Sequence, residues 1–316
     1  MKILITGAMG YVGGRLSEYL LSLYSKEQLF LATTRIDPPV WAQGFPLVRM
    51  DLTDFLSVER VIKNTRPDVV IHLAGLSQSE CEQDPALADR VNVDGTKTLV
   101  QICGANGVSR FLFMSTFQVY GRASGEISET QTVDPRNEYA RTKLLAETMV
   151  RDGSVRGMVP IIFRLSNGFG YPMDARVAES VLKLAVNSFC RQIVREQKIH
   201  VHSDQYRNFI SLNNVARAVE FVLAQDPNNF VNPVFNVGGL ANFSMGELAR
   251  KIALVYKNMY QDRDIPITVN KDRSGIGIWS PFIYKYDRLS ALGFTIKDDM
   301  DLEIKKTIMF FEENKL

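Results

Sequence analysis

A tyrosine and a lysine four residues apart, Tyr139 and Lys143 in the segment YARTK, are the pair with the clearest potential chemistry. On a helix this spacing places both side chains on one face, one turn apart. A phenol is a poor base at neutral pH, but an ammonium beside it favours the phenolate and lowers the phenol pKa. Such a pair is more commonly a solvated surface pair, so the catalytic interpretation depends on its surroundings.

The segment STFQVYG, residues 115–121, lies before this pair and follows the apolar run FLFM. Ser115 and Thr116 provide hydroxyls at a predicted strand end, whereas Phe117 and Gln118 carry no proton that ionises at neutral pH. This strand end can orient a substrate oxygen, but it supplies no acid of its own.

A glycine turn, GAMGYVG, lies between the predicted strand KILIT and an amphipathic segment near the start of the chain. In this context glycines permit a tight turn, a close approach of the backbone to a pyrophosphate, and packing of the helix on the strand. The turn predicts dinucleotide binding, with an ordinary glycine-rich turn as the alternative.

Short apolar runs alternate with amphipathic segments through about residue 165. This rhythm predicts an α/β fold, a Rossmann-type doubly wound parallel sheet with helices on both faces. We expect a dinucleotide-binding domain at residues 1–165 plus about 207–238, and a smaller α/β substrate-binding lobe at about 166–206 plus 239–316.

The composition is that of a soluble globular protein, with 316 residues, 46% hydrophobic, 23% charged and a net charge of +2. We expect neither nucleic-acid binding nor membrane insertion. Cys81, Cys103 and Cys190 show no CxxC spacing and no secretory signal is evident, which favours the cytoplasm. His200 and His202 share one face of a predicted strand, but no third ligand has spacing support, so we expect no metal.

The GxxGxxG spacing is similar to that of the short-chain dehydrogenase/reductase superfamily. The segments VVIHLAG, VNVDGT, STFQVYG, YARTK, FRLSNGFG, RNFISLNNVARAV and FNVGG then follow in order. Together they resemble the extended short-chain dehydrogenases of the NAD-dependent epimerase/dehydratase family, which act on nucleotide sugars.

The resemblance implies a role for each matching residue. Thr116 would position the substrate, Tyr139 would be the acid/base, and Lys143 would bind the nicotinamide ribose and tune Tyr139. The implied cofactor contacts are Gly7, Gly10, Tyr11, Val12, Gly13, Arg35, Asp51, Leu52, His72, Ala74, Gly75, Asn92, Tyr139 and Lys143. The implied substrate contacts are Ser77, Gln118, Asn167 and Arg207, with the last two on the diphosphate.

Several of these assignments have alternatives. Arg35 favours NADP through a 2′-phosphate, but a shift of two residues would make Asp37 a ribose ligand and favour NAD. DLTD, which holds Asp51 and Leu52, also fits a helix N-cap, and Asn92 also fits hydrogen bonding within a helix. For Arg207 the alternative is a salt bridge within the lobe.

The chain departs from the family pattern in its second lobe. Asn208, Asn213 and Asn214 replace acids that are common in the family, and Arg273 is the nearest candidate for a further phosphate-binding arginine. The sequence therefore does not indicate the nucleotide.

Three reactions share this scaffold: reduction of a keto sugar, 4-epimerisation and 4,6-dehydration. Dehydratases of the family carry an Asp-Glu pair where this chain has Phe117 and Gln118, which argues against dehydration. Arg35 favours a 4-ketoreductase of polysaccharide biosynthesis that uses NADPH, with a 4-epimerase as the alternative. A non-catalytic NADP sensor would not need Thr116, Tyr139 and Lys143.

The resemblance also implies a homodimer built from the helices near residues 86–104 and 139–152, packed as a four-helix bundle. Leu99, Val100, Leu144 and Met149 are apolar positions that permit this packing, and ordinary core positions are the alternative.

Overall fold

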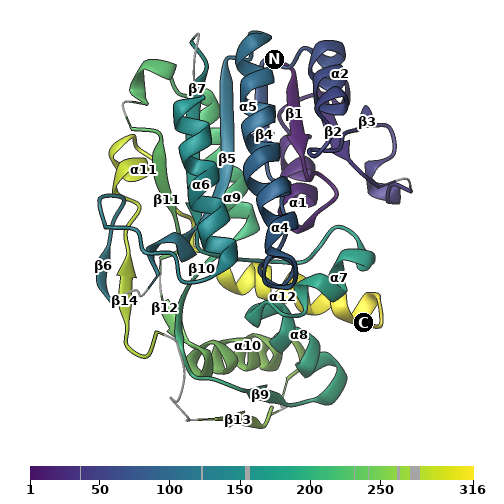
Figure 1. Cartoon of the computed structure of the whole chain (residues 1–316). Coiled ribbons are helices and arrows are strands. Elements are labelled where there is room, and N and C mark those ends of the chain that lie inside the picture. Colours follow the sequence, from purple (N-terminus) through teal and green to yellow (C-terminus); the bar gives the residue numbers. More distant parts are fainter. Residues whose placement is uncertain are drawn as a thin grey trace.

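Seven parallel strands form the main sheet of the chain, which we describe from a computed structural model (Figure 1). The structure describes residues 1–35, 37–121, 124–153, 157–230, 232–240, 242–261, 264–270 and 278–316. The strands lie in the order β3, β2, β1, β4, β5, β7, β11. Their bounds are β1 Ile3–Thr6, β2 Leu29–Thr33, β3 Leu47–Arg49, β4 Val69–His72, β5 Arg110–Thr116, β7 Val159–Leu165 and β11 Val234–Val237. The predicted doubly wound parallel sheet is confirmed.

The strand order reverses between β1 and β4. From β1 the chain continues to β2 and β3 on one side, whereas β4, β5, β7 and β11 extend the sheet on the other. Ile3 is in register with both Leu29 of β2 and Val69 of β4, so β1 lies at the reversal. In open α/β sheets ligands bind at such a point, outside the carboxyl ends of the strands. The glycine turn follows β1 directly and therefore lies there.

Helices cover both faces of this sheet because alternate strand residues point to opposite faces. Ile3 and Ile5 pack in a hydrophobic cluster with α1 (Tyr11–Leu20) and α9 (Leu212–Ala224). Leu4 packs in another cluster with α2 (Phe55–Thr65), α5 (Gly95–Ala105) and α6 (Glu138–Asp152). The strands are thus apolar on both faces, as their sequences predict.

Helix α6 carries the YARTK segment. Asn137 caps its first turn, since its side-chain oxygen accepts a hydrogen bond from Ala140 N at 2.8 Å. The helix ends at Asp152, and Gly153 follows as the predicted stop. Figure 1 shows α6 beside α5 on the same face of the sheet.

A second group of elements lies at the carboxyl ends of these strands (Figure 1). The helices α8 (Ala185–Glu196), α10 (Met245–Tyr260) and α12 (Met300–Glu313) enclose one hydrophobic cluster. Three small sheets join β8 (Asn167–Phe169), β10 (Tyr206–Ser211) and β12 (Asn242–Ser244); β9 (Ile199–Val201) and β13 (Ile267–Val269); and β6 (Gly125–Ile127) and β14 (Phe282–Tyr284). The remaining helices are α3 (Gln78–Gln83), α4 (Pro85–Ala88), α7 (Ala175–Val181) and α11 (Asp287–Ala291).

The chain crosses between the two groups more than once. Residues 234–237 form the edge strand of the large sheet, whereas residues 206–211 pair with a small sheet. The division at residues 165, 207 and 238 into a cofactor domain and a substrate lobe stays a prediction.

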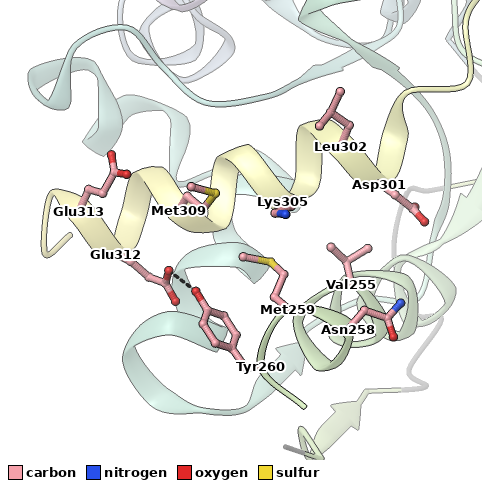
Figure 2. A pocket seen from close by; sticks show the side chains of 10 residues that line it. All are labelled: Val255, Asn258, Met259, Tyr260, Asp301, Leu302, Lys305, Met309, Glu312 and Glu313. Carbon is pink, nitrogen blue, oxygen red and sulfur yellow. Dashed lines mark hydrogen bonds between the residues drawn. The ribbon is translucent and has the colours of Figure 1, made fainter. Parts of the chain in front are cut away.

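An open groove lies between α10 and α12, with a volume of about 580 Å³ (Figure 2). Val255, Met259 and Met309 contribute apolar surface, and the Tyr260 hydroxyl donates to Glu312 at 2.5 Å. None of the predicted site residues is among the residues that line it.

Candidate functional site

The glycine turn after β1 is built for close approach of the backbone. Gly7 has a φ of +65°, and a Cβ there would lie 2.7 Å from the Ala74 nitrogen. A Cβ on Gly13 would overlap the carbonyl oxygen of Gly7. Gly10 is the N-cap of α1, so the helix begins at the turn. Both the tight turn and the helix-on-strand packing that the sequence predicts are present.

A cleft of about 500 Å³ opens beside this turn. Segments from the ends of β1, β2, β3 and β4 line it: Thr6, Gly7, Met9, Gly10, Ala32, Thr33, Thr34, Arg35, Met50, Asp51, Leu52, Thr53, Leu73, Ala74, Gly75, Leu76, Glu80 and Val91. Its position at the strand-order reversal and its glycine floor fit a dinucleotide. Gly7, Gly10, Ala74 and Gly75 would hold the cofactor here, together with Arg35, Asp51 and Leu52 at the adenosine end.

The two predicted roles of DLTD, a cofactor contact and a helix N-cap, fall on different residues. Asp51 lines the cleft and Asp54 caps the helix. Asp51 accepts from Thr53 N at 2.9 Å and from the Thr53 hydroxyl at 2.7 Å, which lowers the pKa of its carboxyl. Asp54 caps α2 by accepting from Leu56 N at 3.0 Å. The DLTD turn therefore both lines the cleft and forms the start of α2.

Arg35 lines the cleft but is not free of other charges. Its guanidinium lies 3.5 Å from Asp174, the residue before α7. Asp174 also pairs with Arg176 at 3.0 Å, and Arg176 in turn pairs with Asp37 at 2.9 Å; the Asp37 side chain is 88% exposed. Asp37 is not among the cleft residues, so the structure gives it no contact with the predicted ribose site.

His72 differs from the expectation that it lines the cofactor site. Its side chain is fully buried beneath the cleft, where it hydrogen-bonds with Thr6 at 2.7 Å and Thr96 at 2.9 Å. Burial lowers the pKa of His72 to about 3, so the ring is neutral. Thr6 in turn accepts from Ala74 N at 3.1 Å. We therefore expect His72 to act on the cleft through Thr6 and the β4 end.

Asn92 is buried in a π-helical turn, Asp89–Asp94, between α4 and α5. Its side-chain oxygen accepts from Leu76 N at 2.8 Å, and its amide donates to Thr142 of α6 at 3.1 Å. These bonds join different elements, so the alternative of hydrogen bonding within a helix does not describe them. Asn92 fixes the β4 loop against the helix that carries Tyr139, and π-helical turns are frequent at functional sites.

Thr116 and Tyr139 meet at the end of β5. Thr116 accepts from Gln118 N at 3.2 Å, which leaves its own proton for the Tyr139 hydroxyl, whose pKa it lowers. Lys143 lies one turn further along α6 and is 5% exposed. A Cβ on Gly75 would lie 2.9 Å from the Asn92 side-chain oxygen and 3.7 Å from the Lys143 nitrogen, so Gly75 leaves room for Asn92 and lies beside Lys143. The predicted catalytic residues are therefore adjacent.

Burial dominates the acid–base properties of this pair. It raises the pKa of Tyr139 to about 12, although the Thr116 hydrogen bond acts in the opposite direction. It lowers the pKa of Lys143 to about 8, although Cys81 and Glu147 act in the opposite direction. The expected lowering of the phenol pKa is thus not found, because desolvation penalises the phenolate. Tyr139 is a proton donor at neutral pH.

The side chains of Phe117 and Gln118 both contact other residues of the chain. The Phe117 ring stacks on Phe282 at 5.6 Å and meets Tyr284 edge-on at 5.0 Å. The Gln118 side-chain oxygen accepts from the cap residue Asn137 at 2.8 Å. The position that follows Thr116 is thus part of an aromatic cluster that includes β14 of the second lobe.

Arg207 is a partly buried cation, and burial lowers its pKa. No hydrogen bond or ion pair of Arg207 occurs within the described residues, so the predicted alternative of a salt bridge is not found among them. Asn167 donates to Asn208 O at 2.9 Å, which ties β8 to β10 near Arg207. A desolvated guanidinium without a partner in this part of the chain suits a phosphate oxygen.

The amides that replace family acids still tie the lobe together. Asn208 donates to Gly239 O at 3.0 Å and accepts from Gly239 N at 2.8 Å. Asn213 and Asn214 both donate to Asp299, which precedes α12, at 3.1 and 3.0 Å. The carboxylate that Asn213 and Asn214 contact is therefore Asp299, next to α12, and not a residue of α9 itself. Arg273 lies outside the described residues.

Three further predicted positions are engaged elsewhere. The Tyr11 hydroxyl donates to Gly170 O at 2.6 Å and to Asn187 at 3.0 Å, so only its backbone is available to a cofactor. Val12 packs against the α1 core, and Ser77 begins α3, where its backbone donates to Glu80 at 2.7 Å. Leu99 and Val100 lie on α5 and are fully buried in the cluster that this helix forms with the sheet, which makes them core residues of the chain.

His200 and His202 lie side by side on β9, with ring centroids 4.5 Å apart, and both are exposed. Within the described ranges no group of three His, Cys, Asp or Glu side chains is placed to hold a metal. No helix in this part of the chain is both long and apolar enough to cross a membrane.

Sequence reasoning missed four residues that contact the predicted centre. Asn137, Cys81, Thr142 and Glu147 cap, pack against or extend the Tyr139 helix. Glu147 could have been found, because it continues the spacing of Tyr139 and Lys143 by four residues. Cys81 gives no comparable signal, since its contact with Asn92 joins separate helices.

Comparison with known proteins agrees with this geometry. The family described as "NAD dependent epimerase/dehydratase family" matches residues 3–238. A mouse protein named dTDP-D-glucose 4,6-dehydratase is 24% identical over 99% of this chain and 89% of its own length. The structure of UDP-glucose 4-epimerase from Thermotoga maritima with UDP-glucose has a TM-score of 0.83 at 21% identity, with both chains fully covered. That of RMD from Pseudomonas aeruginosa with NADPH has a TM-score of 0.78 at 24% identity, over 99% and 100% of the chains. These structural likenesses establish the fold.

Proposed function

Because the chain belongs to the NAD-dependent epimerase/dehydratase family, an enzyme family, we propose that it transfers hydride between a nicotinamide cofactor and a nucleotide-activated sugar. Within this class we propose a 4-ketoreductase that uses NADPH. The supporting observation is the partly exposed Tyr139 beside Thr116, on the same helix as the buried Lys143, with no carboxylate at the two positions after Thr116.

The reduction needs a proton donor at the sugar carbonyl oxygen, and Tyr139 fits this role. Its phenol is protonated at neutral pH, since burial raises its pKa to about 12. Thr116 orients the same oxygen from the β5 end, and Lys143 stabilises the phenolate that remains after proton transfer. A nicotinamide dinucleotide in the adjacent cleft would supply the hydride.

Elimination needs an acid for the leaving hydroxyl and a base for the neighbouring carbon, and these positions hold Phe117 and Gln118. The Phe117 ring is packed on Phe282 and Tyr284, and the Gln118 amide is bonded to Asn137. A phenyl ring and an amide transfer no proton at neutral pH. This supports hydride transfer without dehydration, although some relatives of the chain are named dehydratases.

Substrate binding supports the nucleotide-sugar class. Arg207 is a desolvated cation with no partner among the described residues, and we propose that it binds the diphosphate with Asn167. Gln118, at the strand end, would contact the hexose. The nucleotide identity is left to experiment.

A 4-epimerase that retains NAD is the second candidate, and one observation favours it. Arg35, the residue that favours NADP, already contacts Asp174 at 3.5 Å, which weakens its attraction for a 2′-phosphate. An epimerase would return the hydride to the opposite face of the same sugar, so Tyr139 would first act as base and then as acid.

The deciding experiment mixes the protein with NADPH and a panel of 4-keto nucleotide sugars that differ in nucleotide, and follows nicotinamide absorbance. We expect stoichiometric loss of NADPH with one member of the panel. Isomerisation of a UDP- or dTDP-hexose without net loss would instead identify the epimerase. A 4-keto-6-deoxy product formed from a 4-hydroxy sugar would refute both.

We also propose that the protein is a cytoplasmic homodimer that serves polysaccharide biosynthesis, on the family resemblance and the cysteine pattern. Light scattering of the purified protein tests the dimer.

A further inference from the structure

A buried carboxylate continues the stripe that Tyr139 and Lys143 form on α6. Glu147 follows Lys143 by four residues, so all three side chains lie on one face of the helix. The Glu147 side chain is 0% exposed. A carboxylate at this depth requires partners that explain its burial.

Glu147 has partners on two strands of the main sheet. It accepts from the Ser115 hydroxyl at 2.5 Å, and Ser115 is the neighbour of Thr116 at the end of β5. It also accepts from Arg164 of β7, from Nε at 3.0 Å and from the terminal nitrogen at 2.7 Å. Ser115 and Arg164 are themselves in register across the sheet. One carboxylate thus joins the Tyr139 helix to the strand end that carries Thr116.

Arg164 extends this connection to the second lobe. It donates to the Tyr120 hydroxyl at 3.0 Å, and Tyr120 donates to Asn236 at 2.7 Å. Tyr284 of β14 donates to Asn236 at 2.9 Å and to Arg164 O at 2.7 Å. Hydrogen bonds therefore connect α6, through Arg164, to Tyr284, which packs with Phe117 in the aromatic cluster.

A buried ion pair such as Glu147–Arg164 is not required for the stability of a fold. Apolar residues of similar volume commonly replace a buried ion pair without loss, because desolvation of two charges offsets their attraction. The position of this pair, one turn from Lys143 and one residue from Thr116, indicates a role in the site instead.

Four titratable groups face Lys143. Tyr139 and Glu147 lie on its own helix, Cys81 lies on α3, and His72 lies on β4. Burial keeps His72 neutral and raises the pKa of the Cys81 thiol, so neither carries charge at neutral pH. Lys143 forms no ion pair or hydrogen bond within the described part of the chain. Of these four groups, Glu147 is the carboxylate, paired with Arg164 and one helical turn from Lys143.

We propose that Glu147, held by Arg164 and Ser115, is a positioning residue. It fixes the position of α6 relative to Thr116 and keeps the Lys143 side chain charged. The inference deepens the proposed function, since it concerns how the same centre works. Its test uses cofactor binding, which can be measured even if the proposed sugar reaction is wrong.

The test measures NADPH affinity against pH by calorimetry for the wild-type protein and for Glu147→Gln. Affinity in the wild type should fall as the pH rises through about 8, where the pKa of Lys143 lies. In Glu147→Gln the ammonium loses its anion, so the midpoint should lie about one pH unit lower. An unchanged midpoint would overturn the proposal.

Glu303→Gln is the matched control. Glu303 is also a buried carboxylate, 2% exposed, that pairs with a buried arginine, Arg15, at 3.1 Å. The two variants should lower the unfolding temperature alike, but Glu303→Gln should keep the wild-type midpoint. Equal shifts of the midpoint in both variants would show a general effect of lost stability, against the proposal.

Two more variants cover the case in which Glu147→Gln does not fold. Glu147→Gln with Arg164→Met removes both charges and should still lower the midpoint, by a smaller amount. Glu147→Asp keeps the charge but shortens the reach, so it should keep the midpoint and lower kcat more than it raises KM. The opposite pattern in either variant would refute the assigned role.

Discussion

The ring of Phe117 stacks on that of Phe282, with centroids 5.6 Å apart and planes inclined by 23°. Phe282 lies on β14, more than half the chain away from Phe117 in sequence. The residue after Thr116 is therefore committed to a contact between distant segments. It packs against Phe282 and Tyr284.

Phe117→Ala should test this structural role. We expect the free energy of unfolding to fall by about 2 to 3 kcal/mol, below the value for a fully buried ring because Phe117 is partly exposed. Turnover should stay within about tenfold of wild type, since the Thr116–Tyr139 contact does not involve this ring. Chemical denaturation and steady-state kinetics provide the two measurements. A loss of turnover without a loss of stability would contradict the assignment.

Tyr139→Phe should lower kcat by about 100- to 10,000-fold, because the proton donor is removed while the ring is kept. Cofactor affinity should change little. Tyr256→Phe is the control, at a buried tyrosine whose hydroxyl bonds with Gln197 at a distance of 3.1 Å. Single-turnover kinetics on both variants would separate a lost proton from a general loss of a buried hydroxyl. Substantial turnover by Tyr139→Phe would refute the proposed acid.

Lys143→Met should abolish turnover and yet stabilise the fold. The folded-state pKa of Lys143 lies at about 8, below its ordinary value of 10.5, so at neutral pH the fold holds a charge at a desolvation cost. Removing the charge should add at most roughly 3 kcal/mol to the free energy of unfolding at pH 7.

The sign of the pH dependence follows from the same shift. Between pH 8 and 10.5 the unfolded chain binds more protons than the folded chain at this position, so wild-type stability gains from Lys143 as the pH rises. The advantage of Lys143→Met should therefore shrink over this range, as denaturation at several pH values would measure. Lys97→Met, at an exposed position on α5, should show neither effect. An advantage that grows with pH would contradict the prediction.

Local sequence patterns were sufficient to predict most of the fold and the residues at the centre of the site. The run KILIT, the glycines at 7, 10 and 13, and the four-residue spacing of Tyr139 and Lys143 are short-range signals that report β1, its turn and α6. The contacts that close the site leave no such signal. Tyr11 reaches Asn187 across 176 residues, and Glu147 meets Arg164 only because β5 and β7 are neighbours. The phenol pKa was predicted with the wrong sign because pattern alone does not reveal how strongly the surroundings desolvate the Tyr139 phenol.

Arg207→Met should raise KM for the nucleotide sugar by about 10- to 100-fold, the value of a charged hydrogen bond to phosphate. It should leave cofactor affinity unchanged and should not destabilise the fold, because no partner in the described residues would be left unpaired. Arg191→Met, on α8 of the same lobe, is the matched control and should not affect KM. Kinetics with the preferred sugar nucleotide checks the first effect and thermal unfolding the second. A large loss of stability in Arg207→Met would support a structural role instead.

Asp174→Asn should increase the preference for NADPH over NADH. The Asp174 carboxylate lies 3.5 Å from the Arg35 guanidinium, whose side chain is 40% exposed at the cleft. Neutralising the carboxylate should free Arg35 for a 2′-phosphate and remove a repulsive charge, worth about three- to fivefold in the affinity ratio for a partly solvated pair. Asp37→Asn is the control, since Asp37 is 88% exposed and contacts Arg176, which also pairs with Asp174 at 3.0 Å, but not Arg35. Calorimetric titration with both cofactors measures the ratio. If Asp174→Asn leaves it unchanged while Arg35→Ala lowers it, Arg35 selects the cofactor without help from the second lobe; if neither changes it, Arg35 is a surface charge and the NAD-retaining epimerase becomes the better proposal.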